Sequence, residues 1–297
     1  MLRQDIDPLA DTIPPRYAYE SDDEDEFNPF PNQPSKLSQS SSAVPHNVNV
    51  KIQLGTAELS VGSLVFASGD AGKTWARGAD LGEQVGAAFV ENVQVGLIFH
   101  PQWSSSKALV IVSEVTTRLP TWAMHPYANA ILGKFKPARV AILDTYATST
   151  YITSQPQPHY EAPLRYLHIG SSSPSLNEIS QFSPPNLSQG TTASLLSILA
   201  LPSFSSSPSN SATAILLPTP HPSPLPPATI APTDISKIGA SDDVYGFEDS
   251  LMQKAHAALL KQAGIGGGKM WVGVGGDGKK DIPRSRRGDV GEGSMYI

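Results

Sequence analysis

The sequence predicts an α/β fold: a single mixed-sheet α/β sandwich domain with disordered tails at both ends and Pro/Ser-rich insertions. Short apolar runs at 63–68 and 139–147 have the length and composition of buried strands. They alternate with segments of helical periodicity, of which 243–264 is the clearest, and this alternation is typical of α/β proteins. The apolar runs 93–100 and 108–115 are too close in sequence for a crossover helix, so part of the sheet is expected to be antiparallel.

Residues 1–46 are predicted to form a disordered acidic extension. Residues 1–30 contain 2 Arg against 9 Asp and Glu, and the extension ends in the Ser-rich stretch SKLSQSSSAVPH. The acidic run SDDEDEF at 21–27 is most simply a solvated tail, with a docking or phosphorylation segment at Ser21 as the alternative. We therefore expect a folded α/β domain with Pro/Ser-rich loops to occupy 47–264.

The domain opens with two predicted strands. The segment 48–59 alternates apolar and polar residues at its start, and 63–68 is a short apolar run closed by a Gly-Asp pair. The segment 74–90 could form only a weak helix, because each of three glycines costs about 1 kcal/mol relative to alanine in a helix interior. The three glycines, Gly78, Gly82 and Gly86, are spaced four residues apart. This spacing favours close packing of a helix against a neighbour or, more simply, a loop.

The strand pair 93–100 and 108–115 is followed by a predicted helix at 126–136, since proline suits a first helical turn. The apolar run 139–147 then indicates a buried strand, and 164–170 a short strand after a loop. A Ser/Pro-rich link follows and runs through residue 185.

The last third of the domain contains two predicted helices with a strand between them. A helix is expected within 188–202, with a threonine near its amino end, and a strand at 213–218. After another Pro-rich loop, the segment 243–264 carries an amphipathic stripe that ends at a glycine. Its apolar positions are Phe247, Leu251, Ala255, Ala258 and Leu259. The remainder, 265–297, is predicted to be a flexible tail whose only apolar island is KMWVGV.

Composition and charge exclude several classes of protein. The chain has no cysteine, which excludes disulfides, thiolate nucleophiles and Cys-ligated zinc. No apolar run has the length of a signal peptide core or of a membrane span, so we expect no membrane partner and a cytoplasmic location. The two ends are oppositely charged and give no single basic face, so we expect no nucleic-acid partner.

A loosened phosphate-loop pattern raises the alternative of a P-loop-like ATPase. The pattern follows a predicted strand and consists of Ala67, Gly72, Lys73 and Thr74. In such a site Lys73 would contact the terminal phosphate and Thr74 a magnesium ion, with Asp144 as a second magnesium partner. Alanine in place of the first glycine and the glycine-interrupted segment after the pattern weaken the match, so an ordinary strand-to-loop turn is the simpler interpretation.

No other pattern indicates catalysis. The 7 His residues never occur as HxH or HExxH, and GxSxG is absent. A glycosylation acceptor at 186–188 and an adhesion tripeptide at 287–289 are most simply chance matches in a chain without a secretion signal. We therefore expect that the protein is not an enzyme, with no catalytic residue, no cofactor and no metal site.

The end of the chain carries the candidate partner-binding residues, Met295, Tyr296 and Ile297. They offer a thioether and a ring to bury, a phenol to hydrogen-bond and a free carboxylate that a lysine can bind. A basic run lies upstream; it could steer the tail toward an acidic surface, act in nuclear import or be an inert solvated run. Its members are Lys279, Lys280, Arg284, Arg286 and Arg287.

This ending resembles the tails by which activators and assembly factors dock between neighbouring subunits of the proteasome α ring. The segment 183–202, SPPNLSQGTTASLLSILALP, is similar to a helix segment of proteasome assembly chaperones, and a strand candidate follows it as in that family. The stretches DEDEFNPF at 23–30 and SGDAGKTWARGADLG at 68–82 also look like the proteasome assembly chaperone 1 family. The Ser/Pro-rich insertions depart from a compact version of that family.

The resemblance implies a non-enzymatic chaperone for assembly of the proteasome core particle. It implies a heterodimer with a second assembly chaperone, seated on the outer face of the α ring. The location we expect is the cytoplasm, and also the nucleus if the basic run acts in nuclear import. In this interpretation Ile297 supplies a carboxylate to a pocket lysine, Tyr296 stacks at the pocket wall and Met295 buries its thioether. The other alternative is a proteasome activator or adaptor that binds mature particles through the same tail.

Overall fold

The computed structural model describes most of the segment 48–273. The described residues are 48–55, 61–102, 108–154, 157–170, 174, 176, 178–202, 210–232, 246–266 and 269–273. They belong to one compact unit, which spans Val48–Ile297. The predicted acidic extension, 1–46, and most of the predicted tail lie outside the described residues.

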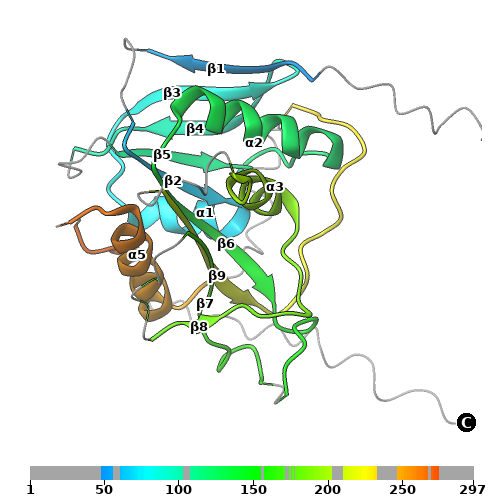
Figure 1. Cartoon of the computed structure of the whole chain (residues 1–297), viewed down its shortest axis with the longest axis vertical. Coiled ribbons are helices and arrows are strands. Elements are labelled where there is room, and N and C mark those ends of the chain that lie inside the picture. The colour runs from blue at the N-terminus through cyan, green and yellow to red at the C-terminus, as the bar shows by residue number, and fades with distance from the viewer. Residues whose placement is uncertain are drawn as a thin grey trace, which may run out of the picture. The chain divides into compact units, whose positions relative to one another are not determined.

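The unit is built on one mixed sheet in the order β1-β3-β4-β5-β2-β6-β9-β7-β8 (Figure 1). Strands β5, β2, β6 and β9 are parallel, whereas β1, β3 and β4 extend the sheet in antiparallel fashion and β7 runs antiparallel to β9. The strands are β1 Val50–Leu54, β2 Ser63–Ser68, β3 Gln84–Val90, β4 Val93–Phe99, β5 Ala108–Ser113, β6 Arg139–Ala147, β7 Arg165–Ile169, β8 Ser180–Gln181 and β9 Ser211–Thr219.

Helices cover both faces of the parallel strands, which explains why these strands are mostly apolar. Every residue of β2 and of β5 is buried. Leu64 and Phe66 pack with α2 (Thr121–Phe135) and α3 (Gly190–Leu199) on one face. Val65 and Ala67 pack with α1 (Gly69–Gly78) and α5 (Asp249–Ala263) on the other. The fold class predicted from the sequence, an α/β sandwich with a mixed sheet, is confirmed.

Several predicted elements match the structure closely. Strands β2 and β6 have the predicted bounds, and β4 and β5 form the predicted antiparallel pair. The structure also contains the predicted helix before β9 and the helix that ends at Gly264, where the chain takes the left-handed conformation that glycine favours. Among the residues that the structure describes, no helix is both long and apolar enough to cross a membrane.

The prediction for 74–90 is wrong. A helix, α1, begins earlier at Gly69, and the second half of the segment is an unpredicted strand, β3. Gly86 lies inside β3, where an added Cβ would be 2.4 Å from the Gln53 carbonyl oxygen of β1. The glycine that argues against a helix is therefore the residue that lets two strands approach each other.

The predicted helix at 126–136 also needs correction, because α2 begins at Thr121. Pro126 lies inside the helix instead of in its first turn. Proline has no backbone N–H, so the helix lacks the hydrogen bond that residue 126 would otherwise donate to the Trp122 carbonyl.

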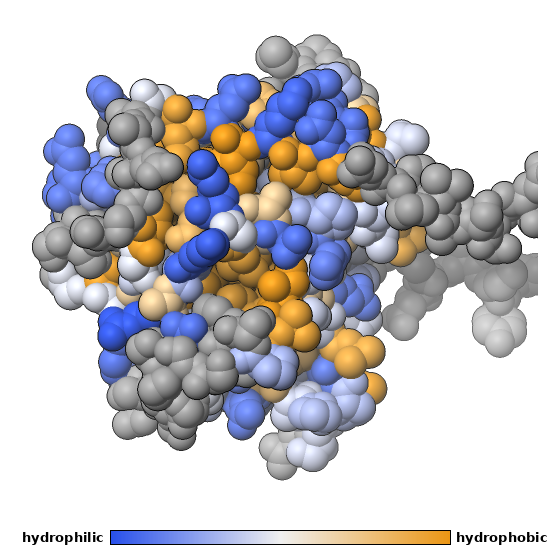
Figure 2. Space-filling view, turned by 45° about the horizontal axis from the view of Figure 1, so that its top comes forward, coloured by the Kyte–Doolittle hydropathy of each residue, from blue (hydrophilic) through white to orange (hydrophobic). Residues whose placement is uncertain are grey.

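Figure 2 turns β1 and α2 toward the viewer and shows hydrophobic residues near the middle of this face, with hydrophilic residues around them.

Candidate functional site at the base of the C-terminal segment

The residues predicted to bind a partner, Met295, Tyr296 and Ile297, lie outside the described residues. The structure does show how the segment that leads to them is attached to the domain. Residues 269–273 are the last that the structure describes, and they lie within the predicted tail, 265–297. We therefore take their contacts as the candidate functional site.

Trp271 anchors this segment to α1. Its side chain is 3% exposed, and its indole N–H donates a 2.9 Å hydrogen bond to the Trp75 carbonyl. One residue later, the Val272 amide donates to the Gly78 carbonyl at 3.1 Å. Burying a tryptophan removes about 150–250 Å² from water, or roughly 4–6 kcal/mol of transfer free energy before the entropy of ordering the segment is counted. The attachment is thus a buried contact.

Gly78 makes room for that contact. An added Cβ at this position would lie 2.4 Å from Trp271 Cε2 and 2.5 Å from the Val272 carbonyl oxygen. Side-chain atoms do not approach so closely, so any larger residue would displace the indole or the backbone of the segment. The absence of a side chain at position 78 is therefore explained by the packing of Trp271 and Val272, which lie far away in sequence.

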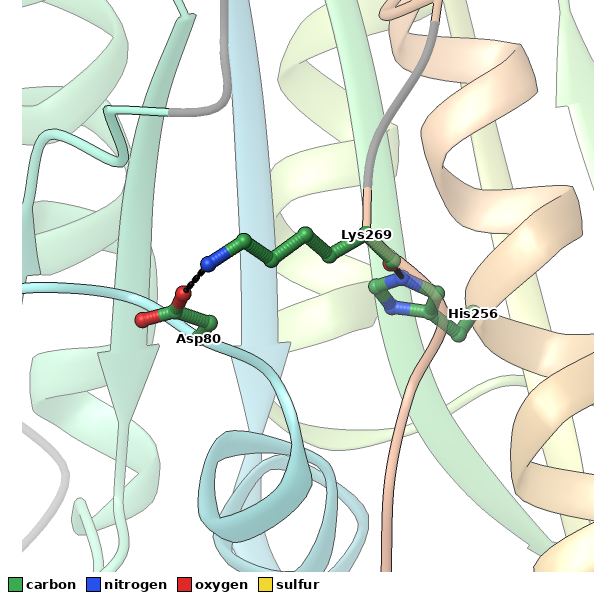
Figure 3. Close-up of polar contacts among 3 residues, drawn as sticks. All are labelled: Asp80, His256 and Lys269. Atoms are coloured by element: carbon green, nitrogen blue, oxygen red, sulfur yellow. Dashed lines mark hydrogen bonds and ion pairs between the residues drawn. The ribbon is translucent and has the colours of Figure 1, made fainter.

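His256 of α5 contacts both Trp75 of α1 and the backbone of Lys269, and Figure 3 shows the second of these contacts. The Trp75 indole N–H donates to His256 Nδ1 at 2.9 Å, so Nδ1 must be an acceptor. The ring proton is then on Nε2, which donates to the Lys269 carbonyl at 2.8 Å. Burial lowers the pKa of His256, against the opposing effect of its bond to the Lys269 backbone. The network therefore favours the neutral ring.

Lys269 also makes a contact with its side chain (Figure 3). The Nζ atom lies 2.5 Å from Asp80 Oδ2, in an ion pair whose side chains are 70% and 54% exposed. Ion pairs this exposed contribute little to stability, because solvent screens them. The two apolar neighbours of Trp271, Met270 and Val272, are 73% and 65% exposed. Buried contacts of Trp271 and His256 thus fix the segment.

The phosphate-loop alternative has no matching geometry. Helix α1 already begins at Gly69, so the positions between Ala67 and Gly72 are mostly its first turn and do not form a loop around a phosphate. Gly72 has a packing role instead, because a Cβ there would lie 2.7 Å from the backbone carbonyl of Ala67. Lys73 and Thr74 lie in the second turn of the helix.

Asp144, the candidate magnesium partner, lies on the other side of the sheet. In β6, Ile142 packs with α2 and α3, and Leu143 packs with α1 and α5. Because side chains alternate along a strand, Asp144 faces α2 and α3, while Lys73 and Thr74 belong to the helix on the opposite face. The structure therefore does not bring these residues together. In the described part of the chain, no group of three or more His, Cys, Asp or Glu side chains is arranged to hold a metal ion.

Comparisons with known proteins give matches at the level of structure. No family model matches the chain, and no curated protein matches it in sequence. Among solved structures, Pyrococcus furiosus PbaB, described as an archaeal proteasome activator, is similar at a TM-score of 0.45 and 10% identity, over 73% of this chain and 89% of that one. Pyrococcus furiosus PbaA, described as an archaeal homolog of proteasome-assembly chaperone, has a TM-score of 0.43 at 11% identity, over 73% and 87%. A Thermoplasma acidophilum protein of unknown function has a TM-score of 0.38 at 14% identity, over 78% and 92%.

Proposed function

We propose that the protein is a non-enzymatic chaperone for assembly of the proteasome core particle. It acts as a heterodimer with a second assembly chaperone and docks Met295, Tyr296 and Ile297 into a pocket between subunits of the α ring. The observation that carries the proposal is the hydrophobic-Tyr-X ending of a segment whose base is held to the domain at Trp271. The protein works in the cytoplasm and in the nucleus, the latter served by the basic run before the ending.

The anchor at Trp271 gives the ending a defined range of action. Residues 274–297 follow the last described residue and number 24. A flexible chain of this length, as the sequence predicts for the tail, has a root-mean-square reach of roughly 27 Å. Once the domain rests on the ring, the ending therefore finds its pocket as an intramolecular partner at an effective concentration on the order of 1 mM. A domain contact and a weak tail contact then reinforce each other.

The arrangement of the segment that resembles assembly chaperones supports the same proposal. Within 183–202 the structure has helix α3, and the next strand in the chain is β9, in the order expected from the resemblance. The stretch at 68–82 begins with α1, the helix against which Trp271 packs. Two stretches that resemble assembly chaperones in sequence, 183–202 and 68–82, therefore contain helices of the folded domain, α3 and α1.

Affinity capture from cell lysate, with mass spectrometry of the recovered proteins, tests the proposal. The bait is compared with a chain that ends at Ser294 and with Lys73→Ala, a control outside the tail. We expect full-length and Lys73→Ala baits to recover α-ring subunits and a second chaperone, whereas the truncated bait keeps only the chaperone. Loss of α-ring subunits with Lys73→Ala, or their absence from every sample, would contradict the proposal.

The same experiment separates assembly from activation. An assembly chaperone recovers α-ring subunits in particles that lack mature catalytic β subunits. A proteasome activator or adaptor, by contrast, recovers complete core particles with the same tail. Recovery of mature particles alone would therefore replace the assembly function with the activator function while keeping the tail as the binding element.

A further inference from the structure

The Pro-rich segment at the end of β9 has an extended backbone that its sequence dictates. From Leu217 to Pro227 every residue is either a proline or the residue before one. Proline fixes its own φ at about −65°, and the residue before a proline is restricted to β or polyproline II conformations. Residues 222–227 accordingly belong to no helix, strand, turn or bend. The segment therefore favours polyproline II, an extended left-handed helix without internal hydrogen bonds.

Hydrogen bonds from the region of α2 hold this segment on the surface of the domain. Arg118, which precedes α2, donates to the Pro224 and Leu225 carbonyls. The indole N–H of Trp122, in the first turn of α2, donates to the Ala228 carbonyl at 3.0 Å. Figure 1 shows the segment in yellow, as a trace along the outside of the domain. The backbone is thus held in place, which lowers the conformational entropy that a partner must remove on binding.

The side chains of the segment are exposed to solvent. All of 221–226 are exposed, and Leu225 is 89% exposed. A polyproline II helix has about three residues per turn, so Pro222 and Leu225 lie together on one edge. Ser223 and Pro226 lie together on a second edge. Both edges are therefore accessible to another protein while the domain holds the backbone.

The segment offers apolar groups and no charge. Residues 217–232 contain no Asp, Glu, Lys or Arg. A partner that binds here must therefore recognise proline rings and the exposed leucine by apolar contact. Aromatic side chains are suited to this, because their flat rings pack against proline and because a preformed polyproline II helix loses little entropy on binding.

We propose that the segment 221–229 is a docking site for a protein domain with an aromatic-lined groove, of the type that binds Pro-rich peptides in SH3 and WW domains. Pro222 and Leu225 enter the groove from the exposed edge, while Arg118 and Trp122 keep their bonds to the backbone. The proposal does not rest on the proposed function, since this segment and the predicted tail are separate stretches of the chain.

Binding of the full-length chain to a panel of purified SH3 and WW domains tests the proposal. We expect at least one domain to bind, with an affinity that changes little with salt concentration because the segment is uncharged. Leu225→Asp should weaken binding by at least about tenfold, the loss expected when one leucine side chain is no longer buried. Leu187→Asp is the matched control; this leucine is 82% exposed in another part of the domain, and its substitution should leave binding unchanged.

Nuclear magnetic resonance of the labelled full-length chain locates the contact. When the bound domain is added, the amide signals of 223, 225 and 228 should shift first. The proposal is overturned if no domain of the panel binds, or if Leu225→Asp binds as tightly as the unchanged chain. It is also overturned if the shifted signals lie in another Pro-rich stretch, in which case 221–229 only connects β9 to the rest of the chain.

Discussion

The substitution Gly78→Ala tests the attachment of the C-terminal segment without altering any residue of that segment. Gly78 is the last residue of α1, and the new methyl group would meet the Trp271 ring at 2.4 Å and the Val272 carbonyl oxygen at 2.5 Å. Neither the buried indole nor the backbone that it holds can give way without losing its contacts. The methyl group and the docked segment therefore compete for the same space.

The size of the effect follows from two opposing terms. Loss of a buried tryptophan costs about 3–5 kcal/mol in a core, which is the upper range for displacing Trp271. Replacing glycine by alanine in a helix returns roughly 1 kcal/mol. We therefore expect Gly78→Ala to lower the free energy of unfolding by about 2–4 kcal/mol, as measured by urea denaturation. Hydrogen exchange should show faster exchange of the Val272 amide, which loses the Gly78 carbonyl as its acceptor.

Gly133→Ala provides a matched control. Gly133 lies inside α2, and nothing is within 4 Å of an added Cβ at that position. The same chemical change should therefore increase the free energy of unfolding, by about 0.5–1 kcal/mol. If Gly78→Ala is as stable as Gly133→Ala and the Val272 amide stays protected, the packing argument for the anchor is wrong.

Three further predictions concern single contacts. The difference in the free energy of unfolding between the unchanged chain and His256→Gln should be constant well above the unfolded histidine pKa of about 6.5 and should shrink as pH falls through it, because unfolded His256 takes up a proton that the folded ring resists. Tyr127→Phe should cost about 1–2 kcal/mol in urea denaturation, because it leaves the buried Ser113 hydroxyl without its 2.9 Å partner. Lys269→Ala should change stability by no more than about 1 kcal/mol, since its ion pair with Asp80 is exposed; a larger loss would mean that the pair does more than the geometry indicates.

The central strands could be predicted because both of their faces are buried. Strands such as β2 and β5 lie between two helix layers, so their sequences are continuous apolar runs that can be recognised without the structure. Strand β3 has no such signature, since it contains Gly86, which allows the close approach of β1. Helix α1 was likewise not predictable from periodicity, because few of its residues are apolar and Trp75 is its only large buried side chain.

The anchor could be predicted only in part. An apolar island containing Trp271 is visible in the predicted tail, but the Trp75 carbonyl that it binds is 196 residues away in sequence. No local pattern joins the two, and Gly78 looks like a helix breaker until the indole beside it is seen. The roles of Met295, Tyr296 and Ile297 stay predictions from the sequence, since they lie outside the described residues.

The late position of Trp271 in the chain has a consequence for synthesis on the ribosome. Strand β2 pairs with β5 and β6, which follow it in sequence, and α1 is covered only after both α5 and Trp271 have emerged. Contacts between residues so far apart slow folding and keep apolar surface exposed in the growing chain. The face of α1 that packs against α5 and Trp271 therefore stays uncovered in the growing chain until residue 271 has been synthesised.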